Sequence, residues 1–227
     1  MSDKKKNVKK IFDSIAFRYD LLNHLLSFGF DYRWRKKALK LSGINSQSVL
    51  LDVACGTGDF AIDAFEIGVR KIIGGDFSYN MLELFSKKSS WSNGNMVQLV
   101  AEHIPFKNSS FTNITVAFGV RNFYDIRMGF QSFFDVLTEN GKATILEFRL
   151  PSNPLVRFIY KFYFKKILPL VGGMISGDKS AYQYLPDSVE EFDEKINLPQ
   201  LLNEVGFKEV KVYSLSLGIV QVVIGAK

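Results

Sequence analysis

The sequence predicts an α/β fold: a doubly wound, Rossmann-like parallel sheet that ends in an antiparallel hairpin. Short apolar segments of strand length alternate with helical segments between residues 49 and 148, which is typical of parallel βαβ units. Near the C-terminus, two strand-like segments instead follow each other across a short turn. The chain has 227 residues, of which 47% are apolar, so we expect a single domain with one sizeable core.

Local signals mark where several of the predicted elements begin or end. Gly43 stops the second helix, Ser78 is the expected N-cap of a later one, and Gly206 closes the last one. Gly218 lies in the turn between the final two strands. The predicted elements, in chain order, are helices over residues 8–26 and 32–41; strands over 49–53 and 71–76; a helix from 78 to about 88; strands over 96–100 and 114–118; a helix over 130–137; a turn at 140–141 and a strand over 143–148; a helix over 198–205; and strands over 208–215 and 219–224.

Composition indicates the cellular compartment of the protein but does not identify its binding partner. The net charge is +6, which is compatible with nucleic acid, an anionic membrane surface or an acidic protein as partner. Cys55 is the only cysteine, so no intrachain disulfide can form and a reducing compartment is the simplest setting. No secretory signal follows Met1, and no apolar run is long enough to cross a bilayer. We therefore expect a cytoplasmic protein that can lie peripherally on the inner face of the membrane.

A glycine loop after the first predicted strand is the centre of the predicted ligand site. Gly56 and Gly58 permit a sharp turn and close approach of a ligand, between a strand and a helix. The same spacing fits nicotinamide dinucleotides, whose pyrophosphate requires positive potential. Asp52 and Asp59 bracket the loop and would repel a pyrophosphate, whereas they suit the ammonium and sulfonium of S-adenosylmethionine. The sequence therefore favours S-adenosylmethionine as the ligand of this loop. The alternative is that the two acids only end a strand and begin a helix, and bind no ligand.

Two further strand ends are expected to hold the nucleoside. Asp76 ends the second strand, where an acid commonly accepts hydrogen bonds from a ribose diol. Val100 and Ala101 follow the third strand, where the adenine is expected. Both cofactor classes use such an acid, so Asp76 indicates a nucleoside without selecting the chemistry, and a plain strand-end acid is its alternative.

More specific motifs lie outside the glycine loop. The most specific are Phe118-Gly119-Val120-Arg121-Asn122-Phe123, and Gly177-Asp178 followed by Ser180, Tyr182 and Tyr184-Leu185. Others are Phe12-Asp13-Ser14-Ile15-Ala16, Arg18-Tyr19-Asp20, Trp34-Arg35, Ala101-Glu102 and Leu146-Glu147-Phe148. In this combination, and over nearly its whole length, the chain resembles the UbiE/MenG family of C-methyltransferases of ubiquinone and menaquinone biosynthesis.

The resemblance implies transfer of a methyl group from S-adenosylmethionine to a ring carbon of a polyprenyl quinol. It implies cofactor contacts at Thr57 and Asp76, and at the positions that Val100, Ala101 and Ala117 occupy here. The family usually has Asp or Asn in place of Val100, and many members have Ser in place of Ala117. These two departures leave open whether a side chain contacts the adenine amino group, and the backbone of Ala101 is the alternative contact.

Methyl transfer to carbon requires a ring with phenolate character, placed in line with the methyl group. Arg121 and Asn122, at the end of the fourth strand, are the candidate catalytic residues: the first can stabilise phenolate charge, and the second can hold a ring oxygen. Guanidinium keeps its proton, so Arg121 is not expected to be a conventional base. A structural ion pair with Asp125 or Glu147 is the alternative for Arg121. Tyr19 is the third candidate, expected to close the site from the N-terminal helix, with a packing role as its alternative.

We divide the chain into an N-terminal helical cover (1–45), a cofactor-binding core (46–150), an insertion or lid (151–196), and the last helix with the hairpin (197–227). The insertion is too long for a simple connection and is expected to cover the carboxyl ends of the strands. Within it, residues 154–176 mix aromatic and basic side chains. They predict either a cover helix with a solvated basic edge, or an amphipathic surface that meets anionic lipid and admits an isoprenoid tail.

The expected partners are a polyprenyl quinol and, transiently, a membrane surface, and a homodimer is compatible with the sequence. Nucleic acid is not expected, because the chain has no motif for flipped bases and no appended basic domain. We expect no metal site; His24 and His103, the only histidines, are expected at the surface. Two rival functions stay open: a class I methyltransferase for another hydrophobic or macromolecular substrate, and a non-catalytic cofactor-binding subunit.

Overall fold

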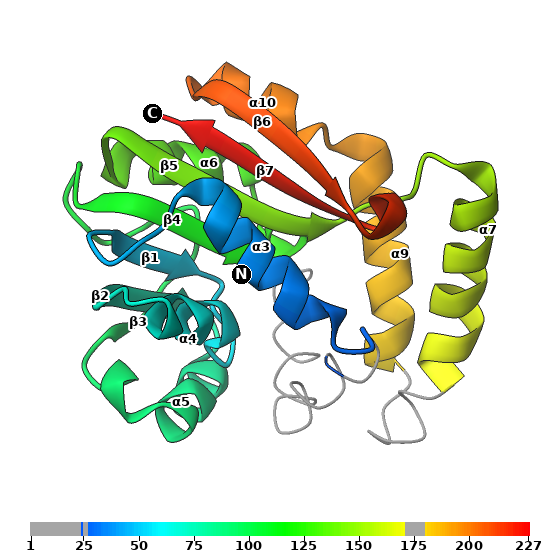
Figure 1. The fold of residues 1–227 in the computed structure, drawn as a ribbon, viewed down its shortest axis with the longest axis horizontal. Helices are drawn as coiled ribbons and strands as arrows, with labels where there is room; N and C mark the ends of the chain where they lie inside the picture. The colour runs from blue at the N-terminus through cyan, green and yellow to red at the C-terminus, as the bar shows by residue number, and fades with distance from the viewer. Residues whose placement is uncertain (1–23, 25–26, 171–179) are drawn as a thin grey trace.

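The computed structural model describes His24, residues 27–170 and residues 180–227. Its centre is a seven-stranded sheet in the order β3-β2-β1-β4-β5-β7-β6 (Figure 1). The strands are β1 (Val49–Val53), β2 (Lys71–Asp76), β3 (Met96–Gln98), β4 (Phe111–Ala117), β5 (Leu137–Phe148), β6 (Lys208–Leu215) and β7 (Val220–Ala226). Strands β1 to β5 pair in parallel, while β7 pairs antiparallel with both β5 and β6. The predicted parallel sheet with a terminal hairpin is confirmed.

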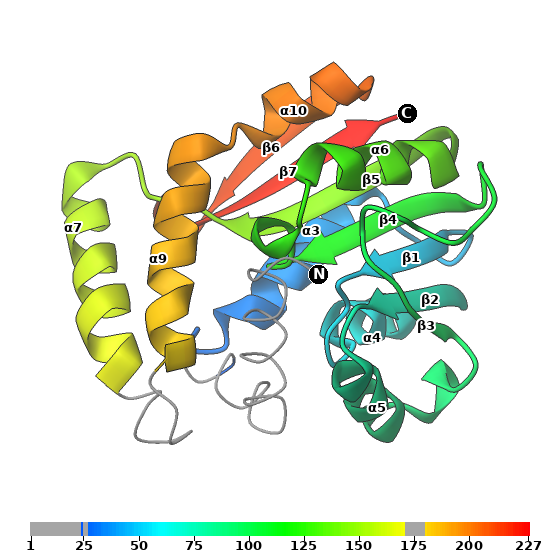
Figure 2. The same ribbon diagram turned by 180° about the vertical axis from the view of Figure 1, so that it is seen from behind.

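Helices cover both faces of the sheet. They are α3 (Phe30–Ser42), α4 (Asp59–Glu66), α5 (Tyr79–Lys88), α6 (Ile126–Val136), α7 (Pro154–Phe162), α9 (Ser180–Lys195) and α10 (Leu198–Val205). Strand residues alternate between two apolar clusters: Leu51 packs with the cluster that contains Phe130 of α6, and Leu50 with the one that contains Trp34 of α3. Figure 1 shows α3 in front of the sheet, and Figure 2 shows α6 and α10 over the opposite face.

The order of the strands places a binding crevice between β1 and β4. The chain proceeds outward from β1 to β2 and β3, and then returns to β4 on the other side of β1. Doubly wound sheets bind their ligands at such a switch point, beyond the carboxyl ends of the strands. The loops that follow the two strands touch here: a Cβ atom on Gly119 would lie 2.7 Å from the Cβ of Ala54. Only glycine therefore fits at position 119.

Several predicted boundaries differ from the observed ones. Helix α6 begins at Ile126 because the Asp125 side chain accepts a hydrogen bond from the backbone of Met128 and caps it. The predicted turn at 140–141 lies inside β5, where Asn140 has a φ of 62° and the register with β4 shifts. Strand β3 ends at Gln98, because the chain beyond it forms a bridge between Val100 and His103 instead. The helix predicted over residues 8–26 falls outside the described residues, apart from His24.

The insertion before the last helix stands at the open end of the crevice. Helix α7 starts at Pro154, continues into the π-helical turn η4 (Tyr163–Ile167), and α9 follows later in the chain. Figure 1 shows α7 and α9 beyond the carboxyl ends of the parallel strands. Within the described part of the chain, no helix is both long and apolar enough to cross a membrane.

Candidate active site

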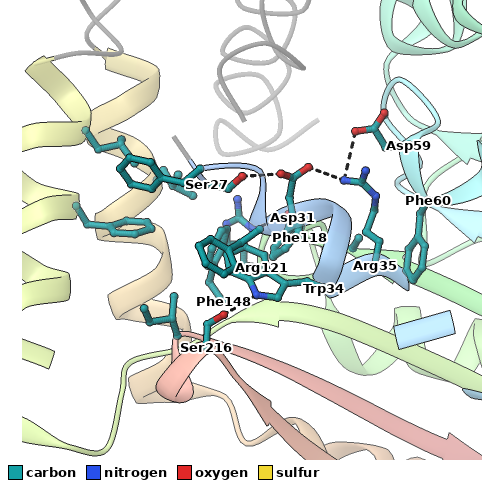
Figure 3. A pocket seen from close by; sticks show the side chains of 18 of the residues that line it. Ser27, Asp31, Trp34, Arg35, Asp59, Phe60, Phe118, Arg121, Phe148 and Ser216 are labelled. Atoms are coloured by element: carbon teal, nitrogen blue, oxygen red, sulfur yellow. Dashed lines mark hydrogen bonds and ion pairs between the residues drawn. The ribbon is translucent and has the colours of Figure 1, made fainter. Parts of the chain in front are cut away.

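A cavity of about 720 Å³ opens at the carboxyl ends of β1 and β4 (Figure 3). Its walls come from the glycine loop, the loop after β4, the first turns of α3, and the covering elements α7, η4 and α9. The short turn η5 (Ser216–Gly218), which joins β6 to β7, closes one side. A volume of this size suits a small-molecule ligand, and most of the lining is apolar. Its charged side chains are Asp31, Arg35, Asp52, Asp59 and Arg121.

The glycine loop forms one wall of this cavity. Gly56 has a φ of 55° and Gly58 a φ of 86°, and Gly58 donates a backbone hydrogen bond to Cys55. Gly56 and Thr57 line the cavity, whereas Gly58 does not. A Cβ atom on Gly58 would lie 2.1 Å from the ring of Phe85, so glycine is required there by core packing rather than by the approach of a ligand.

Asp52 presents a buried carboxylate to the cavity. Its side chain is 1% exposed, and its Oδ1 accepts a hydrogen bond of 2.7 Å from Thr115. Its Oδ2 has no hydrogen-bond partner among the described residues. Burial raises the pKa of Asp52 to about 7, although the hydrogen bond from Thr115 and the nearby backbone amide of Ala61 act against that rise. Such a carboxylate has a strong requirement for a cation or a donor from a ligand.

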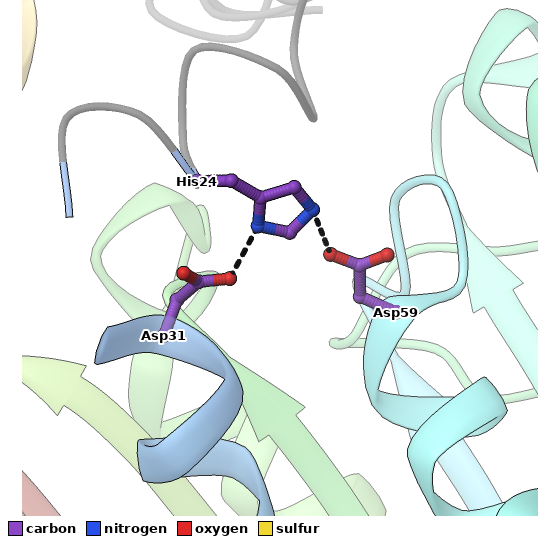
Figure 4. Close-up of side chains that lie close together, drawn as sticks. All are labelled: His24, Asp31 and Asp59. Carbon is purple, nitrogen blue, oxygen red and sulfur yellow. Dashed lines mark hydrogen bonds and ion pairs between the residues drawn. The ribbon is translucent and has the colours of Figure 1, made fainter. Parts of the chain in front are cut away.

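Asp59, the second predicted bracket of the loop, is already engaged by cations of the protein. It forms an ion pair with Lys88, and its Oδ2 lies 3.4 Å from Arg35 Nη1 and 3.5 Å from His24 Nε2. Figure 4 shows His24 between Asp59 and Asp31. The ligand atoms of these three residues lie close enough for a metal ion, but Arg35 and Lys88 supply the positive charge. The cluster is therefore an ion-pair network that ties α3 to α4, and Asp59 repels a pyrophosphate less than the sequence suggested.

Asp76 fixes the backbone of the glycine loop through hydrogen bonds to its carboxylate. Its carboxylate accepts backbone hydrogen bonds from Gly56 (2.9 Å) and from Ser78 (2.8 Å), and its side chain is buried. An ionised carboxylate can accept about four hydrogen bonds, so it can also take ribose hydroxyls. Val100 and Ala101 lie beyond β3; like Asp76, they are not part of the cavity wall. Ala117, at the end of β4, is part of it.

Arg121 lines the cavity and is held by an ion pair. Its Nη1 donates to Oε1 of Glu147 at 2.7 Å, and the same nitrogen donates to the carbonyl of Phe118. Glu147 is fully buried in β5, so the pair is shielded from water. The predicted alternative, a structural pair with Glu147, is thus observed, while Arg121 still borders the cavity. Asn122 does not border it; its Oδ1 accepts a hydrogen bond from the hydroxyl of Tyr184 in α9, which does.

An aromatic wall completes the site, and sequence reasoning found only part of it. Phe118 and Phe148 have ring centroids 4.5 Å apart, and Trp34 packs edge-on against both. The indole of Trp34 donates to Ser216, which fixes the turn η5 at the edge of the cavity. Tyr160 of α7 also lines the cavity, and no sequence signal distinguished it from its aromatic neighbours. Tyr19, the third predicted catalytic residue, lies outside the described residues.

Comparisons with known proteins agree with this geometry. The model of the ubiE/COQ5 methyltransferase family matches residues 1–227. A "Ubiquinone/menaquinone biosynthesis C-methyltransferase UbiE" of Citrifermentans bemidjiense is 43% identical over 233 residues, covering 100% of this chain and 99% of that protein. A "Demethylmenaquinone methyltransferase" of Chlorobaculum parvum is 39% identical, covering 93% of this chain and 89% of that protein.

Solved structures support the fold. A methyltransferase of Thermotoga maritima that depends on S-adenosylmethionine superposes with a TM-score of 0.68 at 18% identity, covering 96% of this chain and 99% of that one. A protein of Methanococcus maripaludis, described in the same terms, gives a TM-score of 0.62 at 18% identity, covering 93% and 91%. The class I methyltransferase architecture predicted from the sequence is confirmed.

Proposed function

The chain belongs to the ubiE/COQ5 methyltransferase family, and on that premise we propose that it methylates a ring carbon of a polyprenyl quinol. It is an S-adenosylmethionine-dependent methyltransferase, and relatives with 38–43% identity are named for quinone biosynthesis. The observation that carries the proposal is a single cavity in which the glycine loop and Arg121 share an aromatic wall. Cofactor and a flat aromatic substrate can therefore meet in one place.

The residues around β1 fit the charged end of the cofactor. When bound, S-adenosylmethionine would supply a methyl group that a nucleophilic carbon can take from the positively charged sulfur, with S-adenosylhomocysteine as the leaving group. Asp52 offers a buried carboxylate oxygen that lacks a partner among the described residues, as the ammonium of the cofactor requires. Thr57 borders the cavity, and Asp76, behind the glycine loop that it holds, accepts the ribose hydroxyls.

Arg121 acts on the quinol. A ring carbon becomes nucleophilic when the neighbouring hydroxyl gains phenolate character, and a guanidinium beside that oxygen stabilises the charge as it develops. Glu147 fixes the direction of the guanidinium and keeps it in place in the absence of substrate. Asn122 acts through Tyr184, whose hydroxyl it holds at 2.9 Å, and is thus a positioning residue.

The outward face of α7 supports peripheral contact with a membrane. Leu155, Phe158, Ile159 and Phe162 follow helical spacing and are each 56–69% exposed. Ile159 also lines the cavity, so the apolar face is continuous with the site. A polyprenyl tail that leaves the cavity beside Ile159 would reach lipid without crossing water. Two of the nearby basic residues, Lys161 and Lys165, pair with Glu190 of α9.

The proposed reaction can be tested directly with purified protein. We expect S-adenosylmethionine and a reduced, short-chain demethylmenaquinol to yield S-adenosylhomocysteine and a quinol that carries one more ring methyl group, detected by mass spectrometry. Omission of the reductant should abolish the product, because the quinone lacks the hydroxyl that activates carbon. Binding of S-adenosylmethionine without methylation of any quinol tested would reject the proposal.

A further inference from the structure

The hydroxyl of Tyr160 is a buried polar group that has no hydrogen-bond partner in the part of the chain that the structure describes. Tyr160 lies in the last turn of α7, is 5% exposed and lines the cavity. Its ring stacks on Phe164 with centroids 4.1 Å apart, in the small apolar cluster that includes Leu150 and Leu168. Among the described residues, no donor or acceptor meets its hydroxyl. Burial of an unpaired hydroxyl destabilises a fold, so a ligand is the natural partner.

Packing does not explain why this residue is a tyrosine. Phenylalanine would fill the same position and stack on Phe164 in the same way, without the cost of the buried hydroxyl. Asp52 Oδ2 is another such atom in the cavity wall, and it belongs to the cofactor end at β1. Tyr160 belongs to the covering helix α7, and it offers a donor. Burial raises the pKa of Tyr160 further above its ordinary value, so the hydroxyl keeps its proton.

A chain of aromatic contacts links Tyr160 to Arg121. Phe148 has its ring centroid 5.8 Å from that of Phe164, and the guanidinium carbon of Arg121 lies 5.9 Å from the Phe148 centroid. Phe148 therefore contacts both the guanidinium of Arg121 and the ring of Phe164, on which Tyr160 stacks. A flat ring that packs against this aromatic wall can therefore meet both polar groups, the guanidinium of Arg121 and the hydroxyl of Tyr160, since both residues line the cavity.

We propose that the Tyr160 hydroxyl donates a hydrogen bond to the ring oxygen of the quinol that Arg121 does not hold. The inference rests on the proposed function and names how the substrate ring is oriented. Arg121 acts at the hydroxyl beside the methylated carbon, and Tyr160 holds the oxygen across the ring. Two polar anchors on opposite edges fix which carbon faces the methyl group, because the aromatic wall alone would permit the ring to rotate.

The variant Tyr160→Phe tests this assignment. We expect kcat/KM for the quinol to fall about tenfold, the scale of one lost hydrogen bond, while the affinity for S-adenosylmethionine stays the same. The melting temperature should stay level or rise, because the variant removes a buried unpaired hydroxyl. Tyr213→Phe, on β6 and away from the cavity wall, controls for loss of a tyrosine hydroxyl as such.

A substrate analogue distinguishes a role of Tyr160 in orienting the quinol ring from a general structural effect of the substitution. It keeps the hydroxyl beside the methylated carbon and lacks the one across the ring, so wild type and Tyr160→Phe should bind and methylate it equally. An unchanged kcat/KM for the full quinol, or the same loss with the analogue, would overturn the inference. A wild-type protein that neither binds nor methylates the quinol would instead reject the proposed function, and this inference with it.

Discussion

The carboxylate of Asp52 is buried at the junction of β1 and the cavity, and its protonation should control cofactor binding. Because its pKa is about 7, the carboxyl group is mostly protonated below neutral pH and mostly ionised above it. We expect affinity for S-adenosylmethionine to fall about fivefold as the pH is lowered from about 7 to about 6, because the ammonium pairs with the ionised form. Calorimetry in buffers of different ionisation enthalpy should show proton release on binding near pH 6.

The same residue has an opposite effect on stability, which provides the control. Its folded-state pKa lies above the ordinary value of 3.8, so the folded protein holds this proton more tightly than the unfolded chain. The contribution of Asp52 to the free energy of unfolding is therefore full at low pH and is lost as the pH rises towards about 7. Asp52→Asn should raise the melting temperature at pH 8 and bind the cofactor weakly at every pH. Tight binding by this variant would contradict the assignment.

Arg121 combines a structural ion pair with a catalytic position, and Arg121→Lys separates the two. Lysine keeps the charge that the buried Glu147 requires, but it loses the planar fork that can hold a second oxygen. We expect turnover of the quinol to fall about 10²-fold, the scale of one lost electrostatic donor, with cofactor affinity near wild type. Single-turnover rates, cofactor affinity and melting temperature should be measured on one preparation. A destabilised variant with a normal rate per folded molecule would leave Arg121 a structural role only.

Among the elements, those with local signals were predicted well. Ser78 caps α5 and Gly206 ends α10 as expected, because capping depends on residues adjacent in sequence. Contacts between distant residues were not predictable in the same way. The ion pair of Asp59 with Lys88 and the packing of Phe85 on Gly58 both arise from how α4 lies against α5. Residue type and spacing along one segment do not determine such partners.

Helix α7 carries its apolar residues on the outside, unlike a helix that packs only on a core. Replacement of Phe158 and Phe162 by serine removes two exposed aromatic rings from this face. We expect the double variant to bind vesicles of phosphatidylglycerol and phosphatidylcholine less than wild type. Its turnover should fall for a long-tailed quinol in such vesicles and stay unchanged for a soluble, tail-less one. Ile67→Ser, an exposed apolar residue after α4, is the matched control.

The oligomeric state decides what covers this face. If wild type is a dimer without vesicles and the double variant is a monomer, the face of α7 joins two copies of the chain. If the double variant binds vesicles as well as wild type does, the proposal that this face of α7 contacts a membrane would also be rejected. Light scattering coupled to gel filtration and vesicle co-sedimentation distinguish these outcomes on the same samples.

At the scale of the whole molecule, the charge of the cavity opposes the charge of the protein. The chain carries a net charge of +6, yet its described cavity wall holds three aspartates and two arginines. Arg35 is occupied by Asp31 and Asp63, and Arg121 by Glu147. The buried carboxylate of Asp52 remains for a ligand. The cavity is therefore complementary in charge to a cationic cofactor, whereas the net positive charge of the whole chain is complementary to an anionic surface.

This separation predicts which nucleoside ligands stabilise the fold. S-Adenosylhomocysteine keeps the ammonium that Asp52 requires, and at about 100 times its dissociation constant it should add about 2.7 kcal/mol to the free energy of unfolding. For a chain of this size, that corresponds to a rise in melting temperature of about 5–10 °C. NAD at the same concentration should cause no shift, because its pyrophosphate would meet Asp59 in the first turn of α4. The lysine and arginine beside Asp59 weaken that repulsion, so the comparison should be repeated at low and high salt. An equal shift by NAD would show that the acids around the glycine loop do not select the cofactor.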